Sequence, residues 1–390
     1  MRSALLLSAL AAAAAAVWWA TTDPAPTPEP PETVQRGAVA PRVAVHSGSP
    51  ATLEPDAGDA ERAPWVDLNN RAVGLSDEGR LDEAIELLER CVAALPDDET
   101  FRVNLARLLV RRATDAHGSA RGDYAQAIED LARAIELDPG DESLVDLLER
   151  WRRQAELEEG FAGYSSEHFN VRYDADRDDL RNGVQELVDV LERAYSDLWL
   201  MTGHDPVLES GEPIQIVIYK RDDFLAATGL GHWAGGAYDG SIRLPIGNLE
   251  AERAAWTETL RHELTHAFVA SLGGVGVPGW LNEGFAQWFE GDRDRRLRRA
   301  RERVGRGPLF TLEELSGSLA RLGEAEAIAR AYAQSLLLVD HLERFYGERL
   351  LGALIEACGQ DSSPQERFQE RRGFGLDDVV SDLADELAGF

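Results

Sequence analysis

His262-Glu263-Leu264-Thr265-His266 is the stretch from which the organisation of this 390-residue chain can be worked out. Residues four apart on an α-helix lie on the same face, so both imidazoles can reach one metal ion. Glu263 stands beside them, and its carboxylate can reach a water at that ion and act as its general base. The stretch therefore predicts a helix, from about Ala254 to Leu272, that serves both as a core element and as a metal platform.

A second motif supplies a third metal ligand. After the glycine-rich residues 273–279, the sequence Trp280-Leu281-Asn282-Glu283-Gly284-Phe285-Ala286 begins another helical segment. Two histidines and one glutamate fill three positions around a tetrahedral zinc ion and leave the fourth for water, as a catalytic site requires. We therefore expect one Zn²⁺ per chain, bound by His262, His266 and Glu283, with Glu263 as the catalytic base.

Together the two motifs resemble those of the gluzincin zinc metallopeptidases. The second is similar to that of aminopeptidase N-like enzymes, but sixteen residues separate His266 from Glu283, two fewer than in that family, and the G-x-M-E-N stretch is missing. The chain more closely resembles the bacterial peptidase MA-like domains over roughly residues 161–390. That resemblance implies an α+β zincin-like catalytic domain that hydrolyses peptide bonds, and the missing amine-recognition motif favours an endopeptidase.

The resemblance also implies a donor for the oxyanion of the reaction. Gluzincins take this donor from a downstream tyrosine or histidine, which makes Tyr332 the candidate, with a core tyrosine as the alternative. His232 is a weaker candidate, with an ordinary loop histidine as its alternative. Gln287, four residues after Glu283, either fixes a ligand or is an exposed amide. Asn282 or a neighbour is expected to cap its helix.

A small sheet is expected before the metal-binding helix. Residues 168–173 and 214–219 alternate or run apolar as strands do, and an amphipathic helix is predicted between them over 180–200. Asp239-Gly240 is a two-residue turn signal. By resemblance, Ser241 to Leu244 would be the sheet edge on which a substrate peptide lies, and an ordinary hairpin is the alternative.

The first 64 residues have the composition of a targeting segment and a linker. A short positive start and the uncharged apolar run from Ala4 to Ala20 predict a signal peptide or N-terminal membrane anchor over residues 1–20. We therefore expect an exported protein, periplasmic, in the cell envelope or extracellular. Residues 21–64 are rich in Pro and Ala and predict a disordered linker.

Residues 65–160 contain an internal repeat. The sequence of residues 81–91 is echoed by residues 124–134, each with small residues at matching positions and a proline beyond. The pattern resembles the tetratricopeptide repeat, with an insertion around 113–121 and a capping helix over 141–158. An ordinary pair of helical hairpins is the alternative. Two repeats would present a small concave surface for a protein partner.

Charge and cysteine content exclude several classes of protein. A formal net charge of −30 argues against nucleic-acid binding, and Cys91 and Cys358 fall in different predicted domains, so no disulfide framework supports the fold. Residues 292–306 include eight arginines, in contrast to the acidic character of the whole chain. This predicts a solvated helix face or, alternatively, a contact for acidic ligands.

The sequence thus predicts all-α tetratricopeptide-repeat helices followed by an α+β zincin-like metallopeptidase domain. Its expected activity is hydrolysis of a peptide or protein substrate by metal-activated water. The alternative is a non-catalytic envelope scaffold that binds without cutting. The intact Glu263 favours the enzyme, because a domain that only binds does not need a base there.

Overall fold

The computed structural model describes residues 50–53, 61–118, 124–230, 234–305, 307–347, 349–360 and 362–388. Contacts within the chain divide it between Glu159 and Gly160 into two compact units. Among the helices described, none is long and apolar enough to cross a membrane. The predicted signal or anchor at residues 1–20 lies outside the described residues, as does most of the predicted linker, so both stay predictions.

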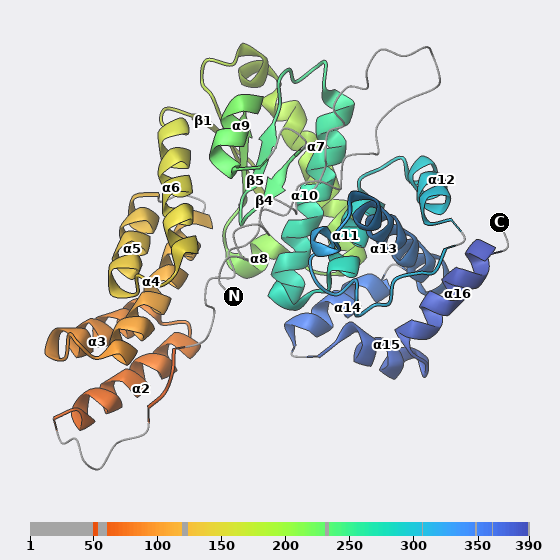
Figure 1. Cartoon of the computed structure of the whole chain (residues 1–390). Coiled ribbons are helices and arrows are strands. Elements are labelled where there is room, and N and C mark those ends of the chain that lie inside the picture. The colour runs from red at the N-terminus through yellow and green to blue at the C-terminus, as the bar shows by residue number, and fades with distance from the viewer. Residues whose placement is uncertain are drawn as a thin grey trace. The chain divides into compact units, whose positions relative to one another are not determined.

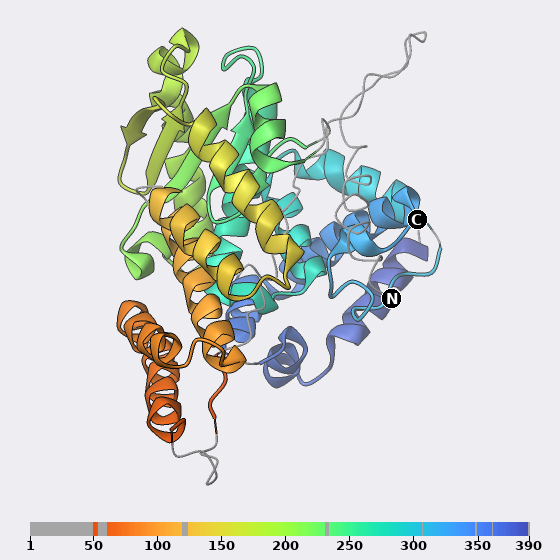
Figure 2. The ribbon, with the colours of Figure 1, turned by 60° about the vertical axis from the view of Figure 1, so that its left-hand side comes forward.

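The repeat unit is a stack of helices in which each packs against the next (Figures 1 and 2). Its helices are α2 (Ala63–Asp77), α3 (Leu81–Ala94), α4 (Glu99–Gly118), α5 (Tyr124–Leu137) and α6 (Glu142–Leu157). Ala84 and Ala127, at matching positions of α3 and α5, are fully buried. Small residues at such positions let neighbouring helices approach closely. The expected helical repeats are therefore present.

The repeat period is visible in the first helix of each pair. Ala72 of α2 and Ala106 of α4 are both buried and stand 34 residues apart, the usual length of a tetratricopeptide repeat. The predicted insertion falls after this point, and part of it, residues 113–118, continues α4. The insertion therefore lengthens the second repeat without disturbing the spacing of the first helices.

The second unit contains a five-stranded mixed sheet of order β1-β2-β3-β5-β4. The strands are β1 (Ala162–Ser165), β2 (Phe169–Tyr173), β3 (Ile214–Tyr219), β4 (Ala237–Tyr238) and β5 (Ile242–Pro245). The central pairs β2/β3 and β3/β5 are parallel, whereas β1 and β4 run antiparallel to their neighbours. The predicted strands near 168–173 and 214–219 are thus adjacent in the sheet.

Helices make up the rest of this unit. They are α7 (Asp178–Thr202), α8 (Pro206–Ser210), α9 (Arg221–Thr228), α10 (Arg253–Gly273), η1 (Gly274–Gly276), α11 (Gly279–Phe289), α12 (Arg293–Val304), η2 (Leu319–Arg321), α13 (Ala325–Tyr346), α14 (Arg349–Gly359), α15 (Pro364–Arg372) and α16 (Leu376–Ala388). Helix α10 contacts β4, β5, α7, α11 and α14, which makes it the central element. Helices α14 to α16 are not among the elements predicted from the sequence.

One strand prediction is wrong. Residues 241–244 do not form the sheet edge, because β5 lies between β3 and β4. The hairpin alternative describes the structure better: Tyr238 pairs with Ile242 across a loop of residues 239–241, one residue longer than the two-residue turn predicted from Asp239-Gly240. The edge strand is the two-residue β4, which is too short to leave a periodic signal in the sequence.

Candidate metal centre

Helix α10 holds the first motif in the interior of the domain. Leu260, Leu264 and Phe268 repeat every four residues and are buried in the hydrophobic core. The side chains of His262 and His266 are buried as well, so α10 is enclosed on both faces. Packing of the apolar face therefore fixes the direction in which the two imidazoles point.

Helix α11 carries the second motif. Its first backbone N–H groups, from Gly279 and Trp280, donate to the carbonyl oxygens of Ser316 and Leu315 at 2.8 and 2.9 Å. These bonds satisfy donors that a helix N-terminus leaves without partners. Asn282 is already inside the helix, and Pro278, which precedes it, makes no side-chain cap, so the expectation that Asn282 or a neighbour caps the helix is wrong.

Gly284 explains why helix α13 lies so close to Glu283. A Cβ added at Gly284 would sit 2.4 Å from the carbonyl oxygen of Ser335 and 2.8 Å from Val339, so a larger residue would push α13 away. Gln287 joins the same two helices, because its amide donates to the carbonyl oxygens of Glu283 and Tyr332 at 3.1 and 3.2 Å. Gln287 is buried, which rules out the exposed-amide alternative.

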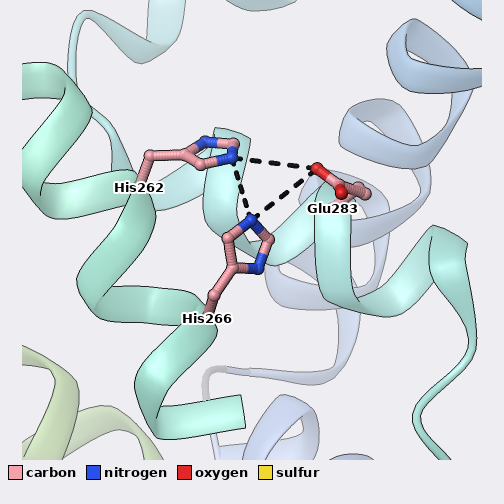
Figure 3. A group of neighbouring side chains, drawn as sticks. All are labelled: His262, His266 and Glu283. Atoms are coloured by element: carbon pink, nitrogen blue, oxygen red, sulfur yellow. Dashed lines mark hydrogen bonds and ion pairs between the residues drawn. The ribbon is translucent and has the colours of Figure 1, made fainter. Parts of the chain in front are cut away.

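The three expected ligands converge (Figure 3). The Nε2 atoms of His262 and His266 are 3.0 Å apart, and they lie 3.8 and 3.9 Å from Oε2 of Glu283. Ligand atoms about 2.0–2.1 Å from a tetrahedral zinc are about 3.3 Å apart, so the observed separations bracket those of a zinc site. No other group of three His, Cys, Asp or Glu side chains gathers this closely in the described part of the chain.

The electrostatics of the cluster fit a divalent cation. Both oxygens of the Glu263 carboxylate and Oε2 of Glu283 are buried and have no hydrogen-bond partner among the described residues. Burial, followed by the charges of Glu283 and Glu290, raises the pKa of Glu263 well above its ordinary value. Burial and Glu290 raise the pKa of Glu283 to about 8. A cation would relieve this repulsion, and the donor set of two imidazoles and a carboxylate suits zinc.

The orientation of each histidine is also fixed by a hydrogen bond at Nδ1, the ring nitrogen that does not face Glu283. Nδ1 of His262 donates to Oε1 of Glu290 at 2.5 Å, and Nδ1 of His266 donates to the side-chain oxygen of Asn282 at 2.9 Å. A proton held at Nδ1 leaves Nε2 free to bind a metal. Burial, together with His262, also lowers the pKa of His266 to about 3, which keeps its imidazole neutral near pH 7.

Arg296 extends this support into the arginine-rich helix α12. Its guanidinium forms an ion pair with Oε2 of Glu290, lies 3.2 Å from Oε2 of Glu258, and donates to the carbonyl oxygen of Gly291. Arg296 is buried, whereas the arginines at 293, 295, 301 and 303 lie nearer the surface and pair with acidic residues of the same domain. Neither interpretation of this helix from sequence anticipated a link to the metal ligands.

Replacing Glu290 should weaken zinc binding. Glu290→Gln removes the negative charge that faces the Nδ1 proton of His262, and partners of this kind typically contribute roughly 10–100-fold to metal affinity. Zinc titration against a competing chelator measures the change. Glu258→Gln is the matched control, because Glu258 also pairs with Arg296, whereas the carboxylate that accepts from Nδ1 of His262 is that of Glu290. Equal zinc affinities for Glu290→Gln and the unaltered protein would show that Glu290 does not support the ligand.

Two further site residues were predicted, Tyr332 and His232. Tyr332, on α13, is half-buried, and its pKa is raised by burial and then by the charges of Glu283 and Glu263. Its hydroxyl therefore lies within electrostatic reach of both carboxylates, and its role as oxyanion donor stays a prediction. His232 lies outside the described residues.

The start of the edge strand lies against the predicted base. A Cβ added at Gly236, next to β4, would be 2.9 Å from Oε1 of Glu263 and 2.7 Å from Thr259. Only glycine fits this close approach without displacing the carboxylate or the helix. The sequence gives no direct sign of this contact, because Gly236 and Glu263 belong to different elements.

Comparisons with known proteins agree with this architecture. The sequence model described as Peptidase MA superfamily matches residues 198–386, and two models of the tetratricopeptide repeat match residues 68–108 and 116–141. No curated protein matches the chain. The resemblance to peptidase MA-like domains and to tetratricopeptide repeats is confirmed, and so is the expected fold class. The chain carries two tetratricopeptide repeats followed by a domain of the peptidase MA superfamily.

Proposed function

We propose that this protein is an exported zinc metallopeptidase that cuts within polypeptide chains. The single observation that carries the proposal is the convergence of His262, His266 and Glu283, next to the carboxylate of Glu263, which has no hydrogen-bond partner among the described residues. Membership of the catalytic domain in the peptidase MA superfamily suggests a metallopeptidase in general terms. Zinc, export and internal cleavage are our extension of that suggestion.

The residues divide the work of hydrolysis between them. His262, His266 and Glu283 would hold the zinc ion, which when bound lowers the pKa of water and polarises the carbonyl of the substrate. Glu263 accepts a proton from the attacking water and then delivers it to the leaving amine nitrogen. Both oxygens of this carboxylate are buried and have no hydrogen-bond partner among the described residues, which leaves them available for the proton.

The sheet edge offers a place for the substrate backbone. We infer that a peptide adds alongside β4, the last strand on this side of the sheet, by strand addition. The contact between Gly236 and Glu263 puts the start of this strand beside the base. Binding by strand addition needs no free amino terminus, and the amine-recognition motif of aminopeptidases is missing from the sequence, so both support cleavage within chains.

One zinc ion per chain is the test of the proposed centre. Purified full-length protein, reconstituted with zinc and freed of excess metal, should contain close to one equivalent by elemental analysis. Only one cluster of three ligating side chains is found in the described part of the chain, which is why we expect no second equivalent. A zinc content near zero would show that His262, His266 and Glu283 do not form a zinc site.

Tyr332→Phe should slow turnover without altering the metal. Loss of one oxyanion donor typically lowers kcat by roughly 10²–10³, because only the hydroxyl meets the developing charge. Zinc content and KM should stay close to those of the unaltered protein. Tyr346→Phe is the control, since it removes a hydroxyl from the same helix about 21 Å further along. Unchanged kcat for Tyr332→Phe would assign this tyrosine to the core.

Export is proposed on the sequence alone. The uncharged apolar run from Ala4 to Ala20 follows a positive start, as in secretory signals and N-terminal anchors. Fractionation of the native cells should find the protein outside the cytoplasm, either free or with the membrane. Recovery of the full-length protein in the cytoplasmic fraction would contradict this part of the proposal.

A further inference from the structure

Exposed apolar side chains are concentrated at one end of the second unit. Trp199 and Leu200, in the last turn of α7, are 48% and 68% exposed, and Leu208, in α8, is 80% exposed. In the described part of this unit, Phe345 on α13 is the one other large apolar side chain that is exposed. Most of the exposed apolar surface therefore comes from residues 199–208.

A contact between α7 and α8 brings the three side chains together. The hydroxyl of Tyr195, one helical turn before Trp199, accepts from the backbone N–H of Val207 at 3.2 Å. The start of α8, and with it Leu208, therefore lies beside the last turns of α7. Trp199 is about 40° around the helix from Tyr195, and Leu200 follows about 100° further on. We call Trp199, Leu200 and Leu208 the apolar corner.

The charge around the apolar corner excludes attraction to an anionic surface. Residues 196–212 contain four acidic residues and no lysine or arginine. The whole chain has a formal net charge of −30, which repels anionic lipids as well. Any partner of this corner must therefore be recognised by its apolar character.

The size of the apolar corner argues against a protein partner. A standard protein–protein interface involves roughly 20–30 residues on each side, so three side chains are too few for a stable dimer. A bilayer interface needs much less, because a few Trp, Phe or Leu side chains can enter the boundary between headgroups and acyl chains. Tryptophan is enriched at that depth. The corner therefore fits the interface of a bilayer of neutral lipids.

The sequence before the described residues supplies a first membrane contact. The uncharged apolar run from Ala4 to Ala20, predicted as a signal peptide or anchor, is separated from Pro50 by the 29 residues 21–49. A proline-rich stretch of this length spans up to roughly 90 Å. An anchor on such a tether keeps the folded units near the bilayer, so a weak second contact forms at high effective concentration.

We propose that the apolar corner inserts into the interface of a bilayer of neutral lipids, and that residues 4–20 are the anchor that brings it there. The inference rests on the proposed export of the protein, and it requires neither zinc nor peptidase activity. Insertion at the end of α7 would fix which side of the second unit faces the membrane.

The test measures whether residue 208 enters the bilayer. Full-length Leu208→Cys protein, labelled with an environment-sensitive maleimide dye, is reconstituted into phosphatidylcholine vesicles with and without a spin-labelled lipid that quenches the dye. Burial raises the pKa of both native cysteines, Cys91 and Cys358, to about 11, so labelling at pH 7 favours the introduced thiol. The spin-labelled lipid should quench the dye at position 208.

A second labelling position separates insertion of the corner from attachment by the anchor alone. Asp222 is exposed on α9, which follows β3, whereas α8 precedes β3, so the two positions lie at opposite ends of that strand. Dye attached to Asp222→Cys protein should not be quenched. Equal quenching at both positions, or none at position 208, would overturn the proposal. Protein that does not stay with the vesicles would overturn it too, because the anchor would be missing.

Removal of the other two apolar side chains should release the corner from the bilayer. Trp199→Ser together with Leu200→Ser in the labelled Leu208→Cys protein should lower the inserted fraction by more than roughly tenfold, while the anchor keeps the protein on the vesicles. Quenching in the protein without these two changes should persist at high salt, because no charge attraction is involved. Quenching that required anionic lipid would contradict the proposal. A dimer in the absence of lipid that the double substitution dissociates would instead assign the corner to a second copy.

Discussion

Glu263→Gln should abolish nearly all peptide hydrolysis while the protein keeps its zinc. The substitution preserves size and removes the base, and Glu263 is adjacent to the ligands without belonging to the cluster of three. Proton transfer by a positioned side chain typically contributes roughly 10²–10⁴ to the rate, and turnover should fall at least that far. Elemental analysis and a continuous peptide-cleavage assay on the same sample measure both quantities.

The variant should also fold normally, because neither oxygen of Glu263 has a hydrogen-bond partner to lose among the described residues. Loss of a buried carboxylate with a strongly raised pKa should leave the free energy of unfolding unchanged or slightly higher. Thermal unfolding provides this control. Full hydrolytic activity of Glu263→Gln would mean that the proposed mechanism is wrong.

Glu283→Gln should act on the metal itself. The change replaces an anionic ligand with a neutral amide at the point where the two imidazoles meet a carboxylate. We expect zinc affinity to fall by more than roughly 100-fold, the upper end of the effect seen for partners outside the ligand shell. Zinc content after dialysis against a weak chelator measures this, and hydrolysis should fall in parallel.

The two glutamates should therefore separate metal binding from catalysis. Glu283→Gln should lose zinc first and activity as a consequence, and excess zinc should restore part of that activity. Glu263→Gln should keep zinc and gain nothing from excess. If both variants lost zinc to the same extent, the assignment of base and ligand to these two residues would be incorrect.

Local periodicity explains what the sequence could predict. The spacing of His262 and His266 is a property of one helix, and the apolar positions of α10 follow the same period. Glu283 lies in a second, short helix, where the motif of residues 280–286 identifies it as a candidate ligand. Both predictions depend on residues that are close together in the chain, and for such residues the geometry of a helix is enough to predict which side chains lie on the same face.

Contacts between distant elements explain what was missed. Glu290 lies at the end of α11, seven residues after Glu283, and nothing in that spacing indicates that it reaches His262 on another helix. Arg296 looked like one more arginine in a charged helix until its burial was known.

Cleavage of a diverse peptide library by the purified full-length protein, before and after removal of metal, tests the central claim most directly. The account predicts cleavage at internal bonds by the zinc-loaded protein, loss of cleavage with a chelator, and recovery when zinc is restored. Cleavage that persists in fully metal-free protein would contradict the zinc mechanism. Zinc-loaded protein that cleaves no member of the library would instead support the non-catalytic scaffold.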